Sequence, residues 1–198
     1  MTYHKEHWKP SVITSPLPPT LVTCAYEDKV NVLTIAWTGI LCTRPPVTYI
    51  SVRPERYSYD IIKNSGEFVI NLPTKELVRA VDRCGVKTGA KLDKFSDCGL
   101  HTEECINVSA PMIAECPVSI ECKVREIIPL GSHDMFIADI VGINAAQELL
   151  DDGGKLCLEK AGLLAYAHGG YFELGKQLGS FGYSVKKNKK RSDKKRRT

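Results

Sequence analysis

Three side chains between Asn31 and Ser58 could together hold a ligand that has a flat ring at one end and a phosphate at the other. Trp37 offers an aromatic face on which a planar ring can stack. Arg53 carries a guanidinium, which pairs well with phosphate oxygens. Ser58 is expected near the start of a helix, where unpaired backbone amides and the helix dipole favour an anion. Each residue also has an ordinary structural alternative, as core, solvated sheet residue or helix N-cap.

Two predicted strands carry the first two of these side chains. Residues 31–38 are rich in β-branched and aromatic residues, and Gly39 is a natural place for the chain to turn. A Pro-Pro loop separates this strand from the next. Residues 47–53 alternate between an apolar face and a face that offers the Ser51 hydroxyl and the Arg53 guanidinium.

The remaining pattern predicts further strands, short helices and one long hairpin. Strands are expected at residues 20–26, 67–72, 117–125 and 133–145, and the last two are joined by a turn at 129–131. Helices are expected at residues 58–66, at 74–85 with a capping residue at its start, and from 93 onward. The strand at 117–125 alternates polar and apolar residues, which is typical of a half-exposed strand. The pattern indicates a mainly β domain with peripheral helices, of the barrel type.

Length and composition suit a single domain. The chain has 198 residues, of which 43% are hydrophobic, so it can bury a substantial core. Residues 1–19 end in the Pro-rich SPLPP and are predicted to form an arm that lies on the domain or on a partner subunit. No apolar run reaches the length of about 18 residues needed to span a membrane, and the N-terminus lacks the apolar core of a signal peptide. A cytoplasmic location is therefore expected.

The positive net charge comes from the C-terminus. Nine of the 27 Lys and Arg residues lie in residues 186–198 beside a single acid, so the rest of the chain carries 18 basic and 22 acidic residues, a formal charge of −4. We expect this tail to be solvated and disordered. The alternative is non-specific nucleic-acid binding, which the lack of any aromatic residue after Tyr183 for stacking disfavours.

The eight cysteines are expected to be reduced thiols rather than a disulfide framework. None forms a C-x-x-C pair, and the histidines and carboxylates show no ligand spacing, so no metal site is predicted. Cys42 lies beside the predicted ring site and could be a reactive thiol, although a small semi-buried hydrophobic residue is the favoured interpretation.

Several motifs resemble one protein family. The run from Asn31 through Trp37, the sequences PPVTYISVRP, RYSYDII and SGEFVINLP, and the later DKF resemble the flavin reductase domain, specifically its flavoredoxin-like branch. The resemblance extends from about Thr20 to Lys187. It implies an FMN-binding split β-barrel over residues 20–185 that works as a homodimer.

The resemblance also implies a set of cofactor-binding residues. They are Asn31, Trp37, Thr38, Ser51, Arg53, Ser58, Lys94, His133 and Tyr166. Trp37 and the backbone around it would hold the ring, and Asn31 would hydrogen-bond to the cofactor. Arg53, Ser58 and Lys94 would hold the phosphate side.

His133 is the candidate catalytic residue. The family commonly has Gly-Asp-His at this place, whereas this chain has Gly131, Ser132 and His133, so the histidine matches and the acid does not. A histidine near the ring can donate a hydrogen bond, and as a cation it would favour the negatively charged reduced flavin. Tyr166 is expected to pack beside the ring, with Tyr171 as a second candidate.

Two flavin functions stay open. In one, the protein resembles a flavoredoxin and carries electrons between protein partners through bound FMN. In the other, it is a flavin reductase that uses NADH or NADPH and supplies reduced FMN to another enzyme. The altered Gly-Ser-His and the ending GSFGYSVKK favour the first. The lack of a G-x-G-x-x-G fingerprint decides nothing, because split-barrel reductases do not use one.

Overall fold

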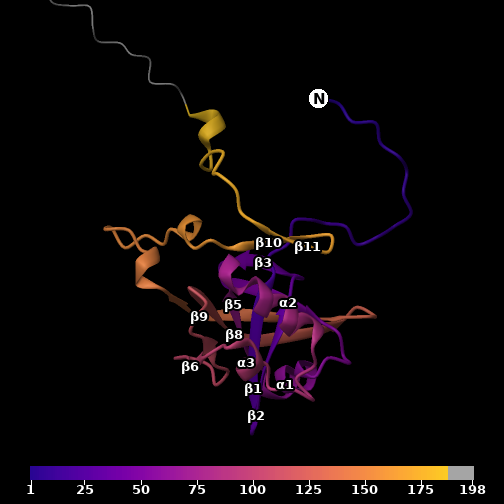
Figure 1. Ribbon diagram of the computed structural model, residues 1–198, viewed down its shortest axis with the longest axis vertical. Helices are drawn as coiled ribbons and strands as arrows, with labels where there is room; N and C mark the ends of the chain where they lie inside the picture. Colours follow the sequence, from indigo (N-terminus) through magenta and orange to yellow (C-terminus); the bar gives the residue numbers. More distant parts are fainter. Residues whose placement is uncertain (187–198) are drawn as a thin grey trace, which may run out of the picture.

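The chain folds around one seven-stranded antiparallel sheet in the order β2-β1-β5-β8-β9-β4-β3 (Figure 1). The computed structural model describes residues 1–186; the tail at 187–198, with its predicted disorder and its alternative role in nucleic-acid binding, lies outside the described residues. The strands of this sheet are β1 (Thr20–Tyr26), β2 (Lys29–Ile35), β3 (Thr38–Thr43), β4 (Pro46–Val52), β5 (Glu67–Leu72), β8 (Val118–Pro129) and β9 (Asp134–Ala145).

Short helices and two small hairpins surround the sheet. The α-helices of the described residues are α1 (Ser58–Ser65), α2 (Val78–Val86) and α3 (Lys94–Cys98). Single 3₁₀ turns lie at Lys75–Leu77, Gln147–Leu149, Leu158–Lys160 and Tyr183–Val185. The small hairpins are β6 (Thr102–Glu103) with β7 (Met112–Ile113), and β10 (Leu164–Ala167) with β11 (Gly170–Glu173).

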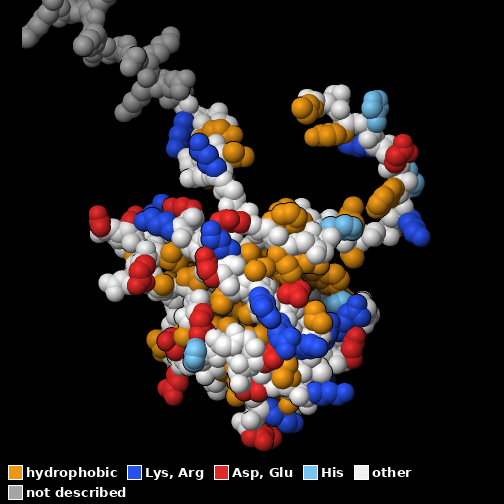
Figure 2. Space-filling view, in the orientation of Figure 1, with side chains coloured by type: hydrophobic (Ala, Val, Ile, Leu, Met, Phe, Trp, Pro, Cys, Tyr) orange, Lys and Arg blue, Asp and Glu red, His pale blue; other side chains and the backbone are white. Residues whose placement is uncertain are grey.

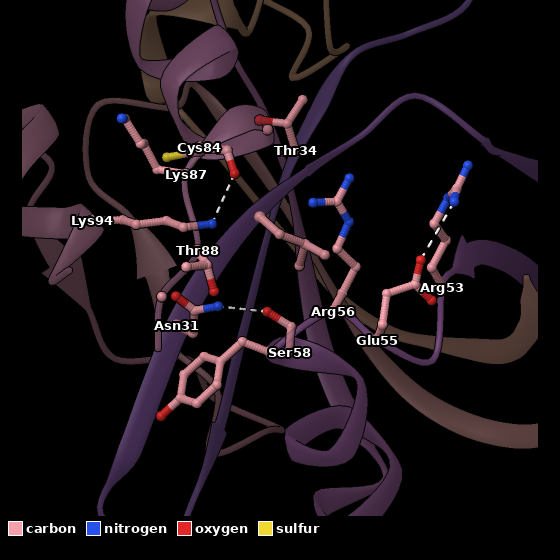
Figure 3. A pocket seen from close by; sticks show the side chains of 14 residues that line it. Asn31, Thr34, Arg53, Glu55, Arg56, Ser58, Cys84, Lys87, Thr88 and Lys94 are labelled. Atoms are coloured by element: carbon pink, nitrogen blue, oxygen red, sulfur yellow. Dashed lines mark hydrogen bonds and ion pairs between the residues drawn. The ribbon is translucent and has the colours of Figure 1, made fainter. Parts of the chain in front are cut away.

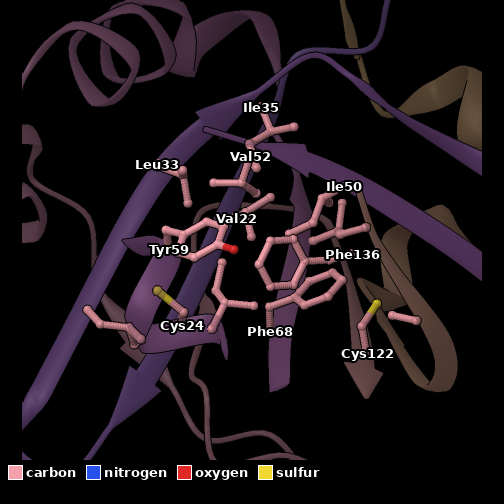
Figure 4. Packing of buried hydrophobic residues seen from close by; sticks show 14 residues of the cluster. Val22, Cys24, Leu33, Ile35, Ile50, Val52, Tyr59, Phe68, Cys122 and Phe136 are labelled. Atoms are coloured by element: carbon pink, nitrogen blue, oxygen red, sulfur yellow. The ribbon is translucent and has the colours of Figure 1, made fainter. Parts of the chain in front are cut away.

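The sheet curls around one apolar core, which closes it into a split barrel. Leu33 of β2 and Val52 of β4 belong to the same buried cluster although their strands lie near opposite ends of the sheet order. Phe68 and Phe136 are fully buried in this cluster, and the Tyr59 ring meets Phe136 edge-on with ring centroids 5.3 Å apart (Figure 4). The fold is therefore the mainly β split barrel with peripheral helices that the sequence predicts.

Helix α2 covers the outer face of β1 and β2. Because side chains alternate along a strand, Leu21 and Val32 point away from the barrel core and pack against Val81 and Cys84 of this helix. The Thr34 hydroxyl on β2 donates a hydrogen bond to the Val81 carbonyl. The end of α2 and the chain that follows it are thereby placed beside β2.

The predicted turn at Gly39 is wrong, because this residue lies in strand β3. The first strand ends at Ile35, and residues 38–43 form an edge strand that pairs antiparallel with β4. Cys42 is exposed on this edge strand rather than semi-buried in a loop. Gly39 and the Pro-Pro pair are typical of turns and loops, so the sequence pattern does not indicate strand β3, which forms by pairing with β4.

Two further expectations need correction. The helix predicted at 74–85 begins with a 3₁₀ turn, Thr74 makes no side-chain cap, and α2 ends at Val86. The polar face of β8 is not solvent-exposed at Glu121, because the chain before β7 covers it. The Glu121 carboxylate accepts hydrogen bonds from the Asn107 backbone at 2.6 Å and from Asn144 Nδ2 at 2.8 Å.

The N-terminal arm touches the body only near its end. Leu17 and Tyr166 of β10 exchange two backbone hydrogen bonds of 2.8 Å. Residues 1–16 are exposed and extend away from the sheet instead of lying on it, as do residues 174–186 (Figure 1). Among residues 1–186, no helix has the length and apolar character needed to cross a membrane.

Candidate functional site

Three polar side chains from distant parts of the sequence meet inside the protein. Asn31 in β2, Ser58 at the start of α1 and Lys94 at the start of α3 are only 3%, 1% and 4% exposed. Asn31 Nδ2 donates a hydrogen bond of 2.6 Å to Ser58 Oγ. Lys94 Nζ donates to the carbonyl oxygens of Val32 at 2.9 Å and Cys84 at 2.8 Å (Figure 3). The fold therefore pre-positions these three of the predicted cofactor-binding residues.

The Lys94 ammonium is unusual because it is buried and no carboxylate of residues 1–186 forms an ion pair with it. Burial lowers the pKa of Lys94, and the nearby Arg56 lowers it further. An ammonium has three N–H donors, and the two carbonyl oxygens use two of them. An anionic ligand would supply both the opposite charge and the remaining acceptor.

A cavity of about 300 Å³, which we call the phosphate-end cavity, opens above these residues. Its lining residues are Asn31, Leu33, Thr34, Arg53, Glu55, Arg56, Tyr57, Ser58, Cys84, Gly85, Lys87, Thr88, Gly89 and Lys94. Four of them are cations and one is a carboxylate, and Glu55 is already paired with Arg53 at 3.4 Å on the exposed rim. Lys and Arg side chains gather over the α2 side of the body in Figure 2. The charge of this cavity suits a phosphate.

Gly89 lets the chain after α2 approach Asn31 closely. A Cβ atom at this position would lie 2.2 Å from Asn31 Oδ1 and 2.6 Å from Asn31 Cγ. Any larger residue at position 89 would therefore displace the Asn31 amide or the loop.

A second cavity of about 400 Å³, the ring-end cavity, adjoins the first. The residues that line both are Leu33, Thr34, Arg53, Arg56 and Gly85. Aromatic side chains dominate the far part of the ring-end cavity. The rings of Trp37 and His133 lie against each other with centroids 4.5 Å apart and planes tilted by 40°, and the centroids of Tyr166 and Tyr171 are 5.3 Å apart. The two cavities form one trough with a cationic end and an aromatic end.

The surroundings of His133 favour its neutral form, because they lower its pKa. Partial burial lowers its pKa, and the nearby cations Arg53 and Arg56 lower it further against a smaller opposite effect of Glu55. The Ser132 hydroxyl hydrogen-bonds to His133 Nδ1 at 2.9 Å. This environment disfavours the predicted cationic role of His133 and suits the predicted hydrogen-bonding role.

The trough brings together seven of the nine predicted cofactor residues: Asn31, Arg53, Ser58 and Lys94 at the phosphate end, and Trp37, His133 and Tyr166, with Arg53 again, at the ring end. Thr38 and Ser51 line neither cavity. The Thr38 hydroxyl donates to the Tyr49 carbonyl at 2.6 Å, and the Ser51 N–H donates to the Trp37 carbonyl at 3.0 Å. These hydrogen bonds fix the backbone at and beside Trp37. Direct contacts of Thr38 and Ser51 with the cofactor stay predictions.

Several residues that line the phosphate-end cavity were not predicted from the sequence. Arg56 precedes Ser58 by two residues, and its charge beside a predicted anion site was an available signal. Lys87, Thr88 and Gly89 lie in the Gly-containing polar segment between α2 and α3. Their position against Asn31 depends on tertiary contacts, so no local pattern indicates it.

Known proteins resemble this chain over most of its length. Residues 13–175 match the flavin reductase like domain. The solved flavoredoxin of Desulfovibrio vulgaris (Miyazaki F) is 30% identical and superposes with a TM-score of 0.86 over 92% of this chain and 100% of its own. The flavoredoxin from Methanosarcina acetivorans is 25% identical, with a TM-score of 0.85 over 93% of this chain and 100% of its own.

A sequence relative from Archaeoglobus fulgidus, which bears no functional name, is 32% identical over 136 residues, which are 69% of this chain and 76% of the relative. The domain match alone covers well over half of the 198 residues. The chain therefore belongs to the flavin reductase like domain family.

Proposed function

We propose that this chain binds FMN in the trough and acts as a flavoredoxin-like electron carrier. The observation that carries the proposal is the buried group of Asn31, Ser58 and Lys94 at the cationic end of a trough whose other end is aromatic. FMN has a phosphate at one end and a flat ring system at the other. The two solved flavoredoxins that resemble the chain support the same assignment.

The residues of the trough divide the work of binding. Lys94 would hold the phosphate with Ser58, and Arg56 would add a second cation at the cavity wall. Trp37 and Tyr166 would cover the ring and exclude water from it. FMN itself supplies the reversible transfer of two electrons, so the protein needs no nucleophile.

A flavin carrier and a flavin reductase differ in what reduces them. The change from Gly-Asp-His to a sequence with Ser132 before His133 supports the carrier, because the acid expected beside the nicotinamide is missing. NADH or NADPH as electron donor belongs to the alternative, a reductase that supplies reduced FMN to another enzyme.

The test is an anaerobic absorbance spectrum of the purified full-length protein, followed by NADH and then NADPH. The proposal predicts a yellow protein whose flavin stays oxidised with both donors and bleaches when a reducing protein partner is added. Rapid bleaching by either nucleotide would replace the carrier by the reductase. A colourless protein that also fails to take up added FMN would refute flavin binding altogether.

A homodimer is the second part of the proposal. The arm leaves large apolar side chains mostly exposed among the described residues, including Tyr3 and Trp8. Figure 2 shows hydrophobic side chains along the arm that projects from the body. A second copy would bury them. Light scattering on the full chain should give the mass of a dimer, and a chain without residues 1–16 should shift toward the monomer. A monomeric full chain would contradict the proposed homodimer. A protein redox partner and a cytoplasmic location are not tested by this experiment and stay predictions.

A further inference from the structure

Two cysteines lie against each other behind the phosphate-end cavity. Cys84 belongs to α2 and Cys98 is the last residue of α3, and their Sγ atoms are 3.8 Å apart. Cys84 is buried and lines the cavity, whereas Cys98 is partly exposed. A disulfide has a sulfur separation of about 2.05 Å, so the two Sγ atoms, now 3.8 Å apart, must approach by roughly 1.8 Å, and rotation of the two side chains would have to supply this movement.

Neighbouring contacts hold the two helices in register for this approach. The residues just before the cysteines form a two-bond ion pair, in which Arg83 Nη2 donates to Asp97 Oδ1 at 2.7 Å and Nε donates to Oδ2. Lys94 of α3 also donates to the Cys84 carbonyl oxygen at 2.8 Å. The backbone around both thiols is therefore fixed before any bond forms between them.

We propose that Cys84 and Cys98 form a redox-active dithiol, which small-molecule disulfides oxidise to a disulfide bond within the chain. Cys98 reacts first, because it is the more exposed of the two residues. Its thiolate attacks one sulfur of the small disulfide, forms a mixed disulfide and releases one thiolate. Cys84 then loses its proton and attacks the Cys98 sulfur, which releases the second thiol. Both cysteines are oxidised, and the small disulfide is reduced to two thiols.

The order of the two steps also follows from the environment of Cys84. Burial and the neighbouring Cys98 raise the pKa of Cys84 to about 12, so its thiol stays protonated at neutral pH. Such a group is a poor first nucleophile. It can still act as the resolving thiol, because its partner sulfur is already in contact with it.

The bond would close a loop that forms one wall of the phosphate-end cavity. The chain between the two cysteines supplies Gly85, Lys87, Thr88, Gly89 and Lys94 to that cavity. A link across its ends restricts how far the loop can open, so we expect slower release of a bound phosphate ligand. This consequence rests on the proposed function, whereas the formation of the bond does not.

The first experiment maps the bond. Full-length protein carrying Cys42→Ser, which removes the exposed thiol on β3, is incubated with glutathione disulfide with and without FMN, digested without reduction and analysed by mass spectrometry. A peptide pair joined through residues 84 and 98, lighter than the two free peptides by two hydrogen atoms and absent after dithiothreitol, supports the proposal. Glutathione adducts with no such pair would overturn it. Adding Cys98→Ser must abolish the pair, whereas adding Cys105→Ser must not.

The second experiment measures FMN release by stopped-flow fluorescence for the oxidised and the reduced protein. We expect release to be at least about threefold slower after oxidation, with no change for Cys98→Ser. Equal release rates would refute the proposed effect of the disulfide on the loop, but they would not contradict a disulfide found by mapping. If the protein takes up no FMN, the mapping without FMN still tests the dithiol, so its failure is distinguishable from that of the proposed function.

Discussion

The two ends of the trough differ in how completely a single chain builds them. At the phosphate end, Asn31, Ser58 and Lys94 are almost fully buried, and hydrogen bonds hold each of them. At the ring end, Trp37 is 38% exposed and Tyr166 lies on a hairpin outside the main sheet. One end is part of the protein core, and the other is a set of aromatic side chains on its surface.

The elements that carry the two ends explain this difference. The phosphate end stands on β2, α1 and α3, which pack on the barrel. Tyr166 and Tyr171 of the ring end lie on the β10–β11 hairpin, which pairs with the arm through Leu17. Leu163, just before this hairpin, forms a bridge with Thr74. Binding energy should therefore be lost most readily by changes at the phosphate end, while changes at the ring end should mainly alter the properties of the flavin.

The largest effect is expected from Lys94→Met. The change removes a buried charge-assisted hydrogen bond and leaves the Val32 and Cys84 carbonyl oxygens without their donor. A loss of about 2 kcal/mol corresponds to roughly 30-fold weaker FMN binding, which quenching of flavin fluorescence would measure. Lys91→Met is the matched control, because Lys91 is exposed and lines neither cavity. Equal affinities for the two variants would remove Lys94 from the phosphate site.

A smaller loss is expected from Gly89→Ala. The added methyl group would overlap the Asn31 side chain and push it away from Ser58. Overpacking of this kind costs about 1 to 2 kcal/mol, so FMN binding should weaken about tenfold. Gly175→Ala adds the same group where nothing lies within 4 Å and should change the affinity little. If Gly89→Ala binds FMN as well as the native protein, Asn31 does not contribute to binding in this position.

At the ring end, Trp37→Leu should weaken FMN binding only about threefold, because the indole is partly solvated and contributes through stacking. The reduction potential and the visible spectrum of the bound flavin should change more clearly than the affinity. Spectroelectrochemistry measures both, and Phe181→Leu is the control, because Phe181 is exposed and lines neither cavity. A loss as large as that of Lys94→Met would mean that the two ends do not differ.

The smallest effect concerns pH. The folded protein holds the pKa of His133 below its ordinary value of about 6.5. The unfolded chain therefore takes up a proton at a higher pH than the folded chain does, and stability should fall as the pH drops through the ordinary value. Thermal unfolding at about pH 7.5 and about pH 5.5 should show this loss, and His133→Gln should reduce it. An unchanged difference in the variant would assign the pH dependence to other groups.

The sequence pattern predicted those helices and strands whose ends are set by residues adjacent in the sequence. Helix α1 ends at Gly66, which adopts a positive φ of 68° and closes the last turn onto Ile62, as its glycine indicates. Strand β5 follows as one continuous buried run. Strand β3 escaped prediction, because its Gly39 favours a turn and only pairing with β4 makes it a strand.

The site residues that lie in the family's sequence motifs could be predicted. The contacts between residues from distant parts of the sequence could not. The hydrogen bond between Asn31 and Ser58 joins residues far apart in the sequence, and only the barrel brings them together. The burial of Lys94 has no local signal, since a lysine in a polar segment is expected on the surface. The contact between Cys84 and Cys98 likewise depends on how α2 and α3 pack.

The most direct test of the account compares FMN with riboflavin, which has the same ring system and no phosphate. The native protein should bind FMN at least about tenfold more tightly than riboflavin, because the buried cation at Lys94 acts only on the phosphate. In Lys94→Met the two affinities should converge. If the native protein binds both compounds equally, the cationic end of the trough is not a phosphate site, and the proposed binding mode of FMN is wrong.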